Sequence, residues 1–294
     1  VIILTYHTPK KIIFDCLKSI DRNTNILIVE NSSIFVHHKE VLTGFPHVRI
    51  ICTGKNLGYG AGNNFGLKQV NTEYALILNP DTVCDKKFFT KVSDLINKTN
   101  NFSIVGCQYI DDSIFMPAGF FDNKKNKEFT KNFRENKIED LTKVDWVTGQ
   151  SMLINLNKFE NREIFDDKYF LYFEEFDLCK SLSIKGENVF TSKNLKVKHL
   201  GFKSSFDENS SQRENVNRLR EWHWMWSTFY FYKKNFNYFH ALKKVIGKFI
   251  KAFFKTIYYT MTLNKKEKEK YKYRFLGIYN AILGRPSNFR DNLK

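Results

Sequence analysis

The chain has 294 residues, 42% of them hydrophobic, which supports one sizeable α/β core with an appended element and excludes a disordered chain. Its formal net charge of +16 is unevenly placed, because residues 233–294 hold 16 Lys or Arg against three acids, a net of +13. The sequence therefore predicts a nearly neutral body followed by a polycationic tail.

Five scattered cysteines without a C-x-x-C pair favour a reducing compartment and argue against a disulfide framework or a structural zinc. The chain opens on the apolar run Val1–Leu4, which is too short for a signal peptide and predicts a first buried strand, with room for a few missing residues before it. No run of 18 uncharged apolar residues occurs, so we expect no transmembrane helix.

The first hundred residues alternate short β-rich runs with helical stretches. Strands separated by helices of this length form right-handed crossovers, so we expect a mostly parallel sheet that binds ligands beyond the carboxyl ends of its strands. The expected strands are 1–6, 26–30, 48–52, 74–78 and 102–105, and the expected helices are 9–20, 61–70 and 86–98.

The polar stretch 110–143, in which Lys124–Lys137 is almost wholly charged or amide-bearing, predicts an irregular surface excursion. Two apolar blocks follow it, then a helix, a strand and a long helical end. Their expected bounds are 144–154 and 164–173 for the blocks, 176–184 for the helix, 188–190 for the strand, and from 212 onward for the helical end.

Asn79-Pro80-Asp81-Thr82 follows an apolar strand, and Pro80 fixes the backbone of the turn that carries the Asp81 carboxylate. A divalent cation on a diphosphate needs only one or two protein carboxylates, because phosphate oxygens and water fill its other positions. An Asp that only closes a turn is the structural alternative. His199, which closes a later strand, is either a metal ligand or a surface histidine.

The segment Asn56–Gly66 holds Gly58, Gly60 and Gly62 and opens a predicted helix, whose N-terminus favours an anion. It matches neither the P-loop nor the dinucleotide-binding pattern and supports neither function. Many such loops are only turns.

Three acids, Glu174, Glu175 and Asp177, follow directly on an aromatic-rich apolar run. One interpretation is a general base in an apolar frame, able to deprotonate an acceptor hydroxyl. The other is structural, with Asp177 paired to Lys180 across one helical turn and Glu174 or Glu175 capping the helix. These residues alone leave both interpretations open.

Taken together, these motifs resemble the glycosyltransferase family 2 enzymes with the A-type fold (GT-A), and among them the rhamnosyltransferase-like branch. The resemblance spans about residues 1–235, and Asn79–Thr82 and Tyr169–Cys179 are its most specific parts. The other matching segments are Thr5-Tyr6, Val29–Ser33, Asn56–Gly60, Val144–Gly149 and His199.

The resemblance implies a GT-A-like α/β fold, with a mostly parallel central sheet flanked by helices, over residues 1–211. We expect a nucleotide-sugar half over about 1–106, an acceptor half over about 107–211, and a basic helical extension over 212–294.

The resemblance also implies roles for individual residues. Asp81 would bind the metal, Mg²⁺ or Mn²⁺, on the donor diphosphate, with His199 as a second ligand and Glu175 as the catalytic base. Trp146 and Gly149 would lie on the acceptor side. The expected donor-binding residues are Thr5, Tyr6, Glu30, Asn31, Asn56, Gly58, Asn79 and Asp81.

Three positions depart from the family's pattern. Asn79 replaces the first acid of its D-x-D-like motif, which leaves one carboxylate fewer for the metal. Glu30 stands where Asp is usual, so the nucleobase contact must reach further. Glu175 also stands where Asp is usual, so Glu174 and Asp177 remain candidates for the base.

The implied reaction is an inverting transfer of a sugar, with rhamnose favoured, to a glycan or lipid-linked glycan acceptor. Family likeness favours dTDP-rhamnose as the donor, with UDP-sugars next. One alternative is another nucleotide-sugar enzyme or a nucleotidyltransferase, although the basic Gly-rich triphosphate loop usual in the latter is absent from the sequence. A second is a nucleic-acid-binding protein, but no RRM, KH or zinc signature accompanies the basic tail.

The tail itself carries an amphipathic pattern. Between Phe239 and Ile257 the apolar residues trace one helical stripe, and lysines fill the remaining face. A basic amphipathic helix of this kind predicts docking on an anionic membrane surface, at the inner face of the cytoplasmic membrane. The alternative is that the stripe packs on the catalytic domain.

Overall fold

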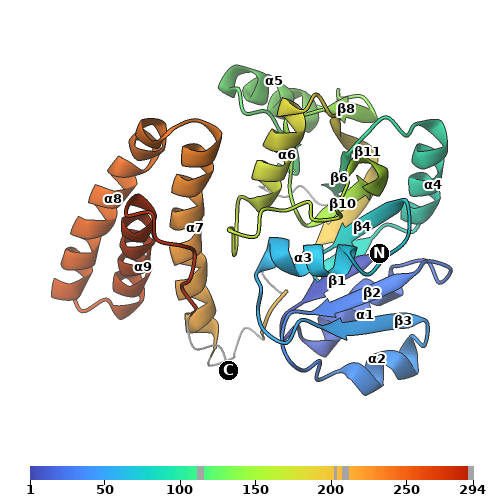
Figure 1. Ribbon diagram of the computed structural model, residues 1–294, viewed down its shortest axis with the longest axis horizontal. Helices are drawn as coiled ribbons and strands as arrows, with labels where there is room; N and C mark the ends of the chain where they lie inside the picture. The colour runs from blue at the N-terminus through green and yellow to red at the C-terminus, as the bar shows by residue number, and fades with distance from the viewer. Residues whose placement is uncertain (111–115, 202–203, 207–211, 291–294) are drawn as a thin grey trace. The chain divides into compact units, whose positions relative to one another are not determined.

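The computed structural model describes residues 1–110, 116–201, 204–206 and 212–290. The chain forms two compact units, here called the sheet unit and the helical unit (Figure 1). Along the chain the sheet unit takes 1–57, 62–165 and 178–207, and the helical unit takes 58–61, 166–177 and 208–294. The domain boundaries expected from the sequence stay predictions.

One sheet organises the sheet unit, with strand order β3-β2-β1-β4-β10-β6-β11-β5 and β8 paired to β11. Of the nine strands that the described residues contribute to it, β10, β5 and β8 run against the other six. The expected mostly parallel sheet is therefore confirmed. The strands are β1 Ile2–Thr5, β2 Ile26–Glu30, β3 Val48–Cys52, β4 Tyr74–Leu78, β5 Thr82–Cys84, β6 Ile104–Tyr109, β8 Leu141–Lys143, β10 Ser151–Asn155 and β11 Val189–His199.

Helices pack on both faces of this sheet because successive strand residues point to opposite sides. Ile3 of β1 faces a core that includes Ile13 of α1 (Lys10–Lys18) and Phe88 of α4 (Phe88–Lys98). Leu4 faces the other side, where α3 (Tyr59–Leu67) approaches closely. A Cβ added at Gly62 would lie 2.7 Å from the Leu4 side chain, so the glycine is needed for this approach.

The polar stretch after β6 is more regular than expected. Residues 123–134 form helix α5 (Asn123–Arg134), whose N-cap Asp122 accepts a hydrogen bond from the Lys125 N–H. The prediction of an irregular excursion is therefore wrong for these residues, because an N-cap and the buried Phe129 support a helix within a charged sequence. Residues 111–115 of that stretch lie outside the described residues.

Short elements complete the sheet unit. They are α2 His38–Gly44, the paired strands β7 Ala118–Gly119 and β9 Trp146–Val147, a single 3₁₀ turn at Leu156–Lys158, and α6 Glu174–Ile184, which starts in the helical unit. Helix α6 begins two residues earlier than expected, and β11 is much longer than the strand expected at 188–190.

The helical unit is built from α7 (Arg213–Asn235), α8 (Tyr238–Met261) and α9 (Lys265–Ile282), which confirms the helical extension expected from residue 212. The helices pack around a core that includes Trp226 and Val245. Asn side chains cap the first turns of α8 and α9. Within the described part of the chain, no helix is long and apolar enough to cross a membrane.

Candidate active site

The carboxyl ends of β1, β2 and β4 form the part of the sheet where a ligand is expected. The chain runs outward from β1 to β2 and β3 and then returns to place β4 on the other side of β1. Ligands of open α/β sheets bind at such a switch point. Thr5 ends β1, Glu30 ends β2, and Asn79-Pro80-Asp81 directly follows β4.

The Glu30 carboxylate is buried and held by neutral donors. Thr5 Oγ1 donates to Glu30 Oε2 at 2.6 Å, and Ser32 Oγ donates to Oε1 at 2.7 Å. The His7 N–H also points to Oε1, at 3.3 Å. These bonds fix the orientation of the Glu30 carboxylate at the end of β2.

Asn31 ties the end of β2 to the loop that follows β3. Its Oδ1 accepts from the Leu57 N–H at 2.9 Å, and its Nδ2 donates to Asn56 Oδ1 at 3.1 Å. Burial raises the pKa of Tyr6, an effect that a hydrogen bond with Asn56 partly offsets and the Glu30 charge reinforces. The Tyr6 phenol therefore keeps its proton at neutral pH and can donate a hydrogen bond.

Asp81 and His199 come together at the next strand ends. His199 ends β11, which pairs with β5 opposite Thr82, and its Nε2 lies 3.4 Å from Asp81 Oδ1. The Leu200 N–H donates to the Asp81 carbonyl oxygen at 2.9 Å. The structure thus brings together two residues that the sequence suggested separately as metal ligands, 118 positions apart.

The donor set fits a divalent cation carried by a diphosphate. The described residues contain no group of three or more His, Cys, Asp or Glu side chains that could hold a metal. A carboxylate and an imidazole alone cannot complete a coordination shell, so phosphate oxygens and water would supply the rest, as is usual for Mg²⁺ or Mn²⁺ at nucleotide sites.

For Gly58 and Trp146, two other expected site residues, the structure shows packing constraints that do not depend on a ligand. Gly58 has φ +91°, and a Cβ there would lie 2.2 Å from the Phe170 carbonyl oxygen within the helical unit. Trp146 packs on Gly119, where an added Cβ would meet the indole at 2.5 Å. Gly149 is half-buried just before β10. Their donor and acceptor contacts stay predictions.

The three neighbouring acids open α6 in different environments. Glu174 and Asp177 are buried, whereas Glu175 is half-exposed. Burial, followed by the charge of Glu175, holds the pKa of Glu174 well above its usual range. The raised pKa favours the neutral form of Glu174.

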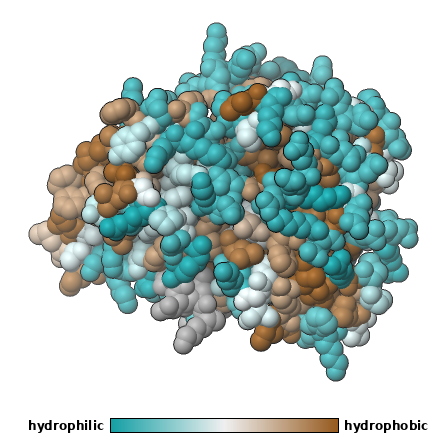
Figure 2. Space-filling view, viewed as in Figure 1, coloured by the Kyte–Doolittle hydropathy of each residue, from teal (hydrophilic) through white to brown (hydrophobic). Residues whose placement is uncertain are grey.

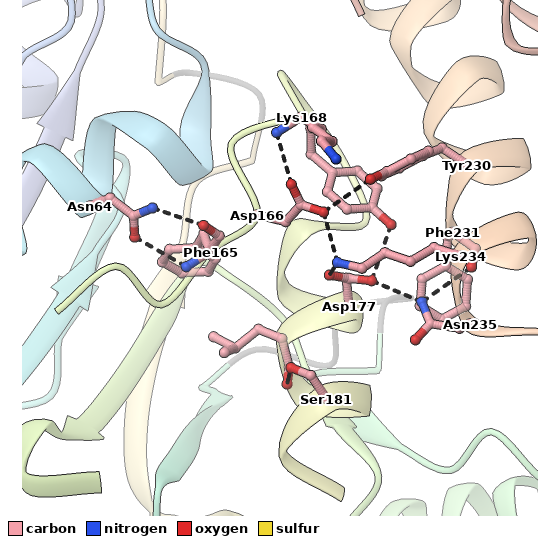
Figure 3. Close-up of polar contacts among 12 residues, drawn as sticks. Asn64, Phe165, Asp166, Lys168, Asp177, Ser181, Tyr230, Phe231, Lys234 and Asn235 are labelled. Atoms are coloured by element: carbon pink, nitrogen blue, oxygen red, sulfur yellow. Dashed lines mark hydrogen bonds and ion pairs between the residues drawn. The ribbon is translucent and has the colours of Figure 1, made fainter. Parts of the chain in front are cut away.

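Asp177 is committed to an ion pair with α7 (Figure 3). Lys234 Nζ lies 2.6 Å from Asp177 Oδ2, and Asn235 Nδ2 donates to Oδ1 at 2.8 Å. The structural interpretation of the sequence expected Lys180 as the partner. The pKa of Glu174 is raised and Asp177 is paired, whereas the assignment of Glu175 as the base stays a prediction.

Sequence reasoning missed the residues that hold this segment. Lys234 and Asn235 lie 57 and 58 residues from Asp177 along the chain. Lys234 carries no distinguishing signal because it is one of 16 basic residues in the tail. Asp166, which also pairs with Lys234, lies in an apolar block whose pattern predicts a buried element and no site residue.

The N-terminal part of the chain matches the model of a known protein family. Residues 1–164 match the model of Glycosyl transferase family 2. The chain is 24% identical over 197 residues to the low-salt glycan biosynthesis hexosyltransferase Agl10 of Haloferax volcanii, covering 60% of this chain and 59% of that protein. It is 22% identical over 193 residues to the N-acetylglucosaminyl-diphospho-decaprenol L-rhamnosyltransferase of Mycobacterium tuberculosis, covering 56% of this chain and 63% of that protein.

A third relative is the rhamnosyltransferase WbbL of Escherichia coli K12, 26% identical over 199 residues, or 60% of this chain and 72% of that protein. The chain thus spans about three fifths of the length of the first two relatives.

Solved structures share the fold at low identity. A mannosyltransferase from Pyrobaculum calidifontis, in complex with GDP-Man and Mn²⁺, superposes with a TM-score of 0.52 at 11% identity, covering 96% of this chain and 86% of that one. GalNAc-T7 with UDP, GalNAc and Mn²⁺ gives a TM-score of 0.53 at 10% identity, covering 84% and 56%. The fold is therefore that of the GT-A glycosyltransferases.

Proposed function

The chain belongs to glycosyl transferase family 2, and from that premise we propose that it transfers a sugar from a nucleoside diphosphate to an acceptor hydroxyl. The observation that carries the proposal is the set of polar side chains at the switch point of the sheet, where Thr5, Glu30 and Asp81 end or follow neighbouring strands. A nucleotide-sugar is the kind of ligand that binds at such a position.

The residues of β1 and β2 would bind the nucleoside. The buried Glu30 carboxylate would accept hydrogen bonds from a base or ribose, and the protonated Tyr6 would donate one. Asn31 and Asn56, which are joined by a hydrogen bond, and Asn79, which follows β4, would supply amide groups.

Asp81 and His199 would hold the divalent metal, Mg²⁺ or Mn²⁺. When bound, the metal stabilises the negative charge that builds on the departing diphosphate, which is worth several kcal/mol at the transition state. The support is their 3.4 Å separation and the donor types that they present.

Glu175 would act as the general base. It takes the proton of the acceptor hydroxyl while that oxygen bonds to the anomeric carbon and the bond from this carbon to the diphosphate breaks. The displacement occurs in one step with inversion and needs no covalent sugar–enzyme intermediate. Base catalysis of this kind contributes roughly 10²–10⁴ in rate.

The relatives suggest the substrates. Two of the three are named rhamnosyltransferases, so dTDP-rhamnose is the favoured donor and UDP-sugars come next. The Mycobacterium tuberculosis relative is named for a diphospho-decaprenol acceptor, which favours a lipid-linked glycan as the acceptor here.

A panel of sugar nucleotides tests the proposal, with and without Mg²⁺ or Mn²⁺. We expect acceptor-dependent release of a nucleoside diphosphate that requires the metal. Release of pyrophosphate from a nucleoside triphosphate and a sugar phosphate would instead identify a nucleotidyltransferase and contradict the proposal.

We also propose that α8 docks on an anionic membrane surface, which suits a lipid-linked acceptor. The apolar residues of α8 include a buried and an exposed group. Ala241, Val245 and Ala252 are buried against the other helices, and a second set is exposed. Figure 2 shows hydrophobic side chains gathered at the surface over α8. The exposed set is Tyr238, Phe239, Ile246, Ile250, Phe253, Phe254, Ile257, Tyr258 and Met261.

Charge favours lipid over a neutral partner. Lys243, Lys244, Lys248, Lys251 and Lys255 are interspersed with that apolar set on the same helix. Each lysine near an anionic surface contributes about 1 kcal/mol, and the exposed Phe and Ile can enter the headgroup region.

Vesicle co-sedimentation tests the docking. The full chain should pellet with anionic but not neutral vesicles and should dissociate at high salt. Lys251→Glu with Lys255→Glu should abolish pelleting, whereas Lys124→Glu with Lys127→Glu on α5 changes the net charge equally and should not. Equal pelleting of both double variants would exclude α8 as the docking surface.

A further inference from the structure

A single lysine joins the two ends of the segment that carries the acids. Within the helical unit, Lys234 Nζ lies 2.7 Å from Asp166 Oδ2 and 2.6 Å from Asp177 Oδ2 (Figure 3). Asp166 is the first residue of the segment and Asp177 the last. Lys234 is therefore a bridge across twelve residues, and it sits at the C-terminal end of α7.

Further hydrogen bonds complete this bridge. Tyr230 OH donates to Asp166 Oδ2 at 3.1 Å, and Tyr169 OH donates to Asp177 Oδ1 at 3.3 Å. The side chains of Asp177, Asp166 and Lys234 are 4%, 17% and 38% exposed. Although burial alone would lower it, the hydrogen bonds to the two carboxylates raise the pKa of Lys234 above its ordinary value. The lysine stays charged at any working pH.

The bridge encloses a strained turn. Tyr172 and Phe173, directly before Glu174, both have φ +71°, in the left-handed region that non-glycine residues rarely adopt. Such residues persist only where the surroundings hold them. Here the surroundings are α7, because Ser227 Oγ donates to the Leu171 carbonyl oxygen at 2.9 Å and the rings of Tyr172 and Trp224 meet edge-on.

We propose that Lys234 is a positioning residue for Glu175: by fixing Asp166 and Asp177 it holds the strained turn and sets the direction of the first turn of α6. The proposal rests on the proposed function, since it assumes that Glu175 is the base. It assigns Lys234 no contact with substrate. A misplaced base loses much of its effect, because a shift of about 1 Å can cost roughly 100-fold in rate.

A purely stabilising ion pair would give the same contacts, so the test must separate stability from turnover. Lys234→Met leaves the Asp177 carboxylate buried without its cation, and we expect a lower melting temperature. Combining it with Asp177→Asn removes that charge and keeps an amide for Tyr169 and Asn235, so the melting temperature should return toward that of the parent.

Turnover should not return with it. We expect both variants to keep the donor Kd of the parent and to lose kcat by on the order of 100-fold, whereas Lys234→Arg, which retains the charge, should stay within about tenfold. Lys233→Met, the exposed neighbour outside the bridge, serves as the matched control and should match the parent.

Hydrogen exchange gives a readout that needs no activity. The Asp177 N–H donates to the Phe173 carbonyl oxygen at 2.8 Å, so its protection reports on the turn. Peptides covering 166–177 should exchange faster in Lys234→Met and in the double variant, but not in Lys233→Met.

The outcomes separate the two proposals. If the parent is active and Lys234→Met keeps its kcat, the positioning role is overturned. It is also overturned if the double variant recovers kcat together with its melting temperature. If the parent transfers no sugar from any donor, the proposed function fails. Selective loss of protection over 166–177 then still supports the bridge, and unchanged exchange overturns it.

Discussion

The two units hold the carboxylates of Glu30, Asp166 and Asp177 in different ways. In the sheet unit, hydroxyls of Thr5 and Ser32 fix Glu30, and a histidine lies beside Asp81. In the helical unit, Lys234 pairs with both Asp166 and Asp177. Hydroxyl donors orient a carboxylate without adding an opposite charge. A lysine, in contrast, neutralises the carboxylates with which it pairs. Glu175 is half-exposed, between Glu174, whose pKa is raised, and the paired Asp177.

We expect the largest effect on sugar transfer from removing the Asp81 carboxylate in the sheet unit. Asp81→Ala should abolish metal-dependent transfer, because the variant loses the carboxylate proposed to hold the cation on the diphosphate. The fold should survive, as judged by the circular dichroism spectrum. Asp94→Ala, an exposed acid on α4, is the control and should leave transfer unchanged. Full transfer by Asp81→Ala would remove the metal role.

The next effect separates the neighbouring acids. Glu175→Gln should lower kcat by roughly 10²–10⁴, the contribution of a general base. Glu174→Gln should cost less than about tenfold, because a neutral amide replaces a buried carboxyl group whose raised pKa favours its neutral form. Steady-state rates measure both. An inactive Glu174→Gln beside an active Glu175→Gln would reverse the assignment.

A pH effect should appear in the helical unit. His223 is buried between Phe289 O at 2.9 Å and Ser287 Oγ at 3.0 Å, and burial lowers its pKa from 6.5 to about 3. Below pH 6.5 His223 therefore takes up a proton in the unfolded chain, whereas in the folded chain it stays neutral down to about pH 3. The free energy of unfolding consequently decreases as the pH is lowered through that window.

By linkage, the free energy of unfolding should drop by roughly 2 kcal/mol between pH 8 and pH 5. Denaturant titrations at both values measure it. His223→Gln is neutral throughout and should flatten this part of the profile, whereas an unchanged slope would show that other groups cause it.

The smallest effect concerns the second metal ligand. His199→Ala should lower activity by about tenfold at limiting metal and less at saturating metal, because one of two protein ligands is lost. Metal titrations of the rate show this as a rightward shift. His47→Ala, an exposed histidine, is the control. Curves that superimpose after scaling would show that His199 does not bind the metal.

The same contrast explains what the sequence could predict. Glu30 ends an apolar run and Asp81 follows another, and short continuous apolar runs of this kind locate buried strands without tertiary knowledge. Lys234 is proposed to act through a contact with a residue 57 positions away, and the sequence around Lys234 does not distinguish it from the other lysines of the tail. Helix α5 was missed because its sequence is almost wholly polar and only its Asp122 cap signals it. The antiparallel β10 in the middle of the sheet depends on strand pairing that local patterns do not encode.

The central claim is that the sheet unit binds the metal-bound donor and that Glu175 acts on the acceptor. Calorimetry of the donor that turns over, with Mg²⁺, tests it in the parent, Glu175→Gln and Asp81→Ala. We predict parental affinity for Glu175→Gln despite its lost turnover, and a large loss of metal-dependent affinity for Asp81→Ala. Weakened binding in Glu175→Gln together with parental binding in Asp81→Ala would contradict the account.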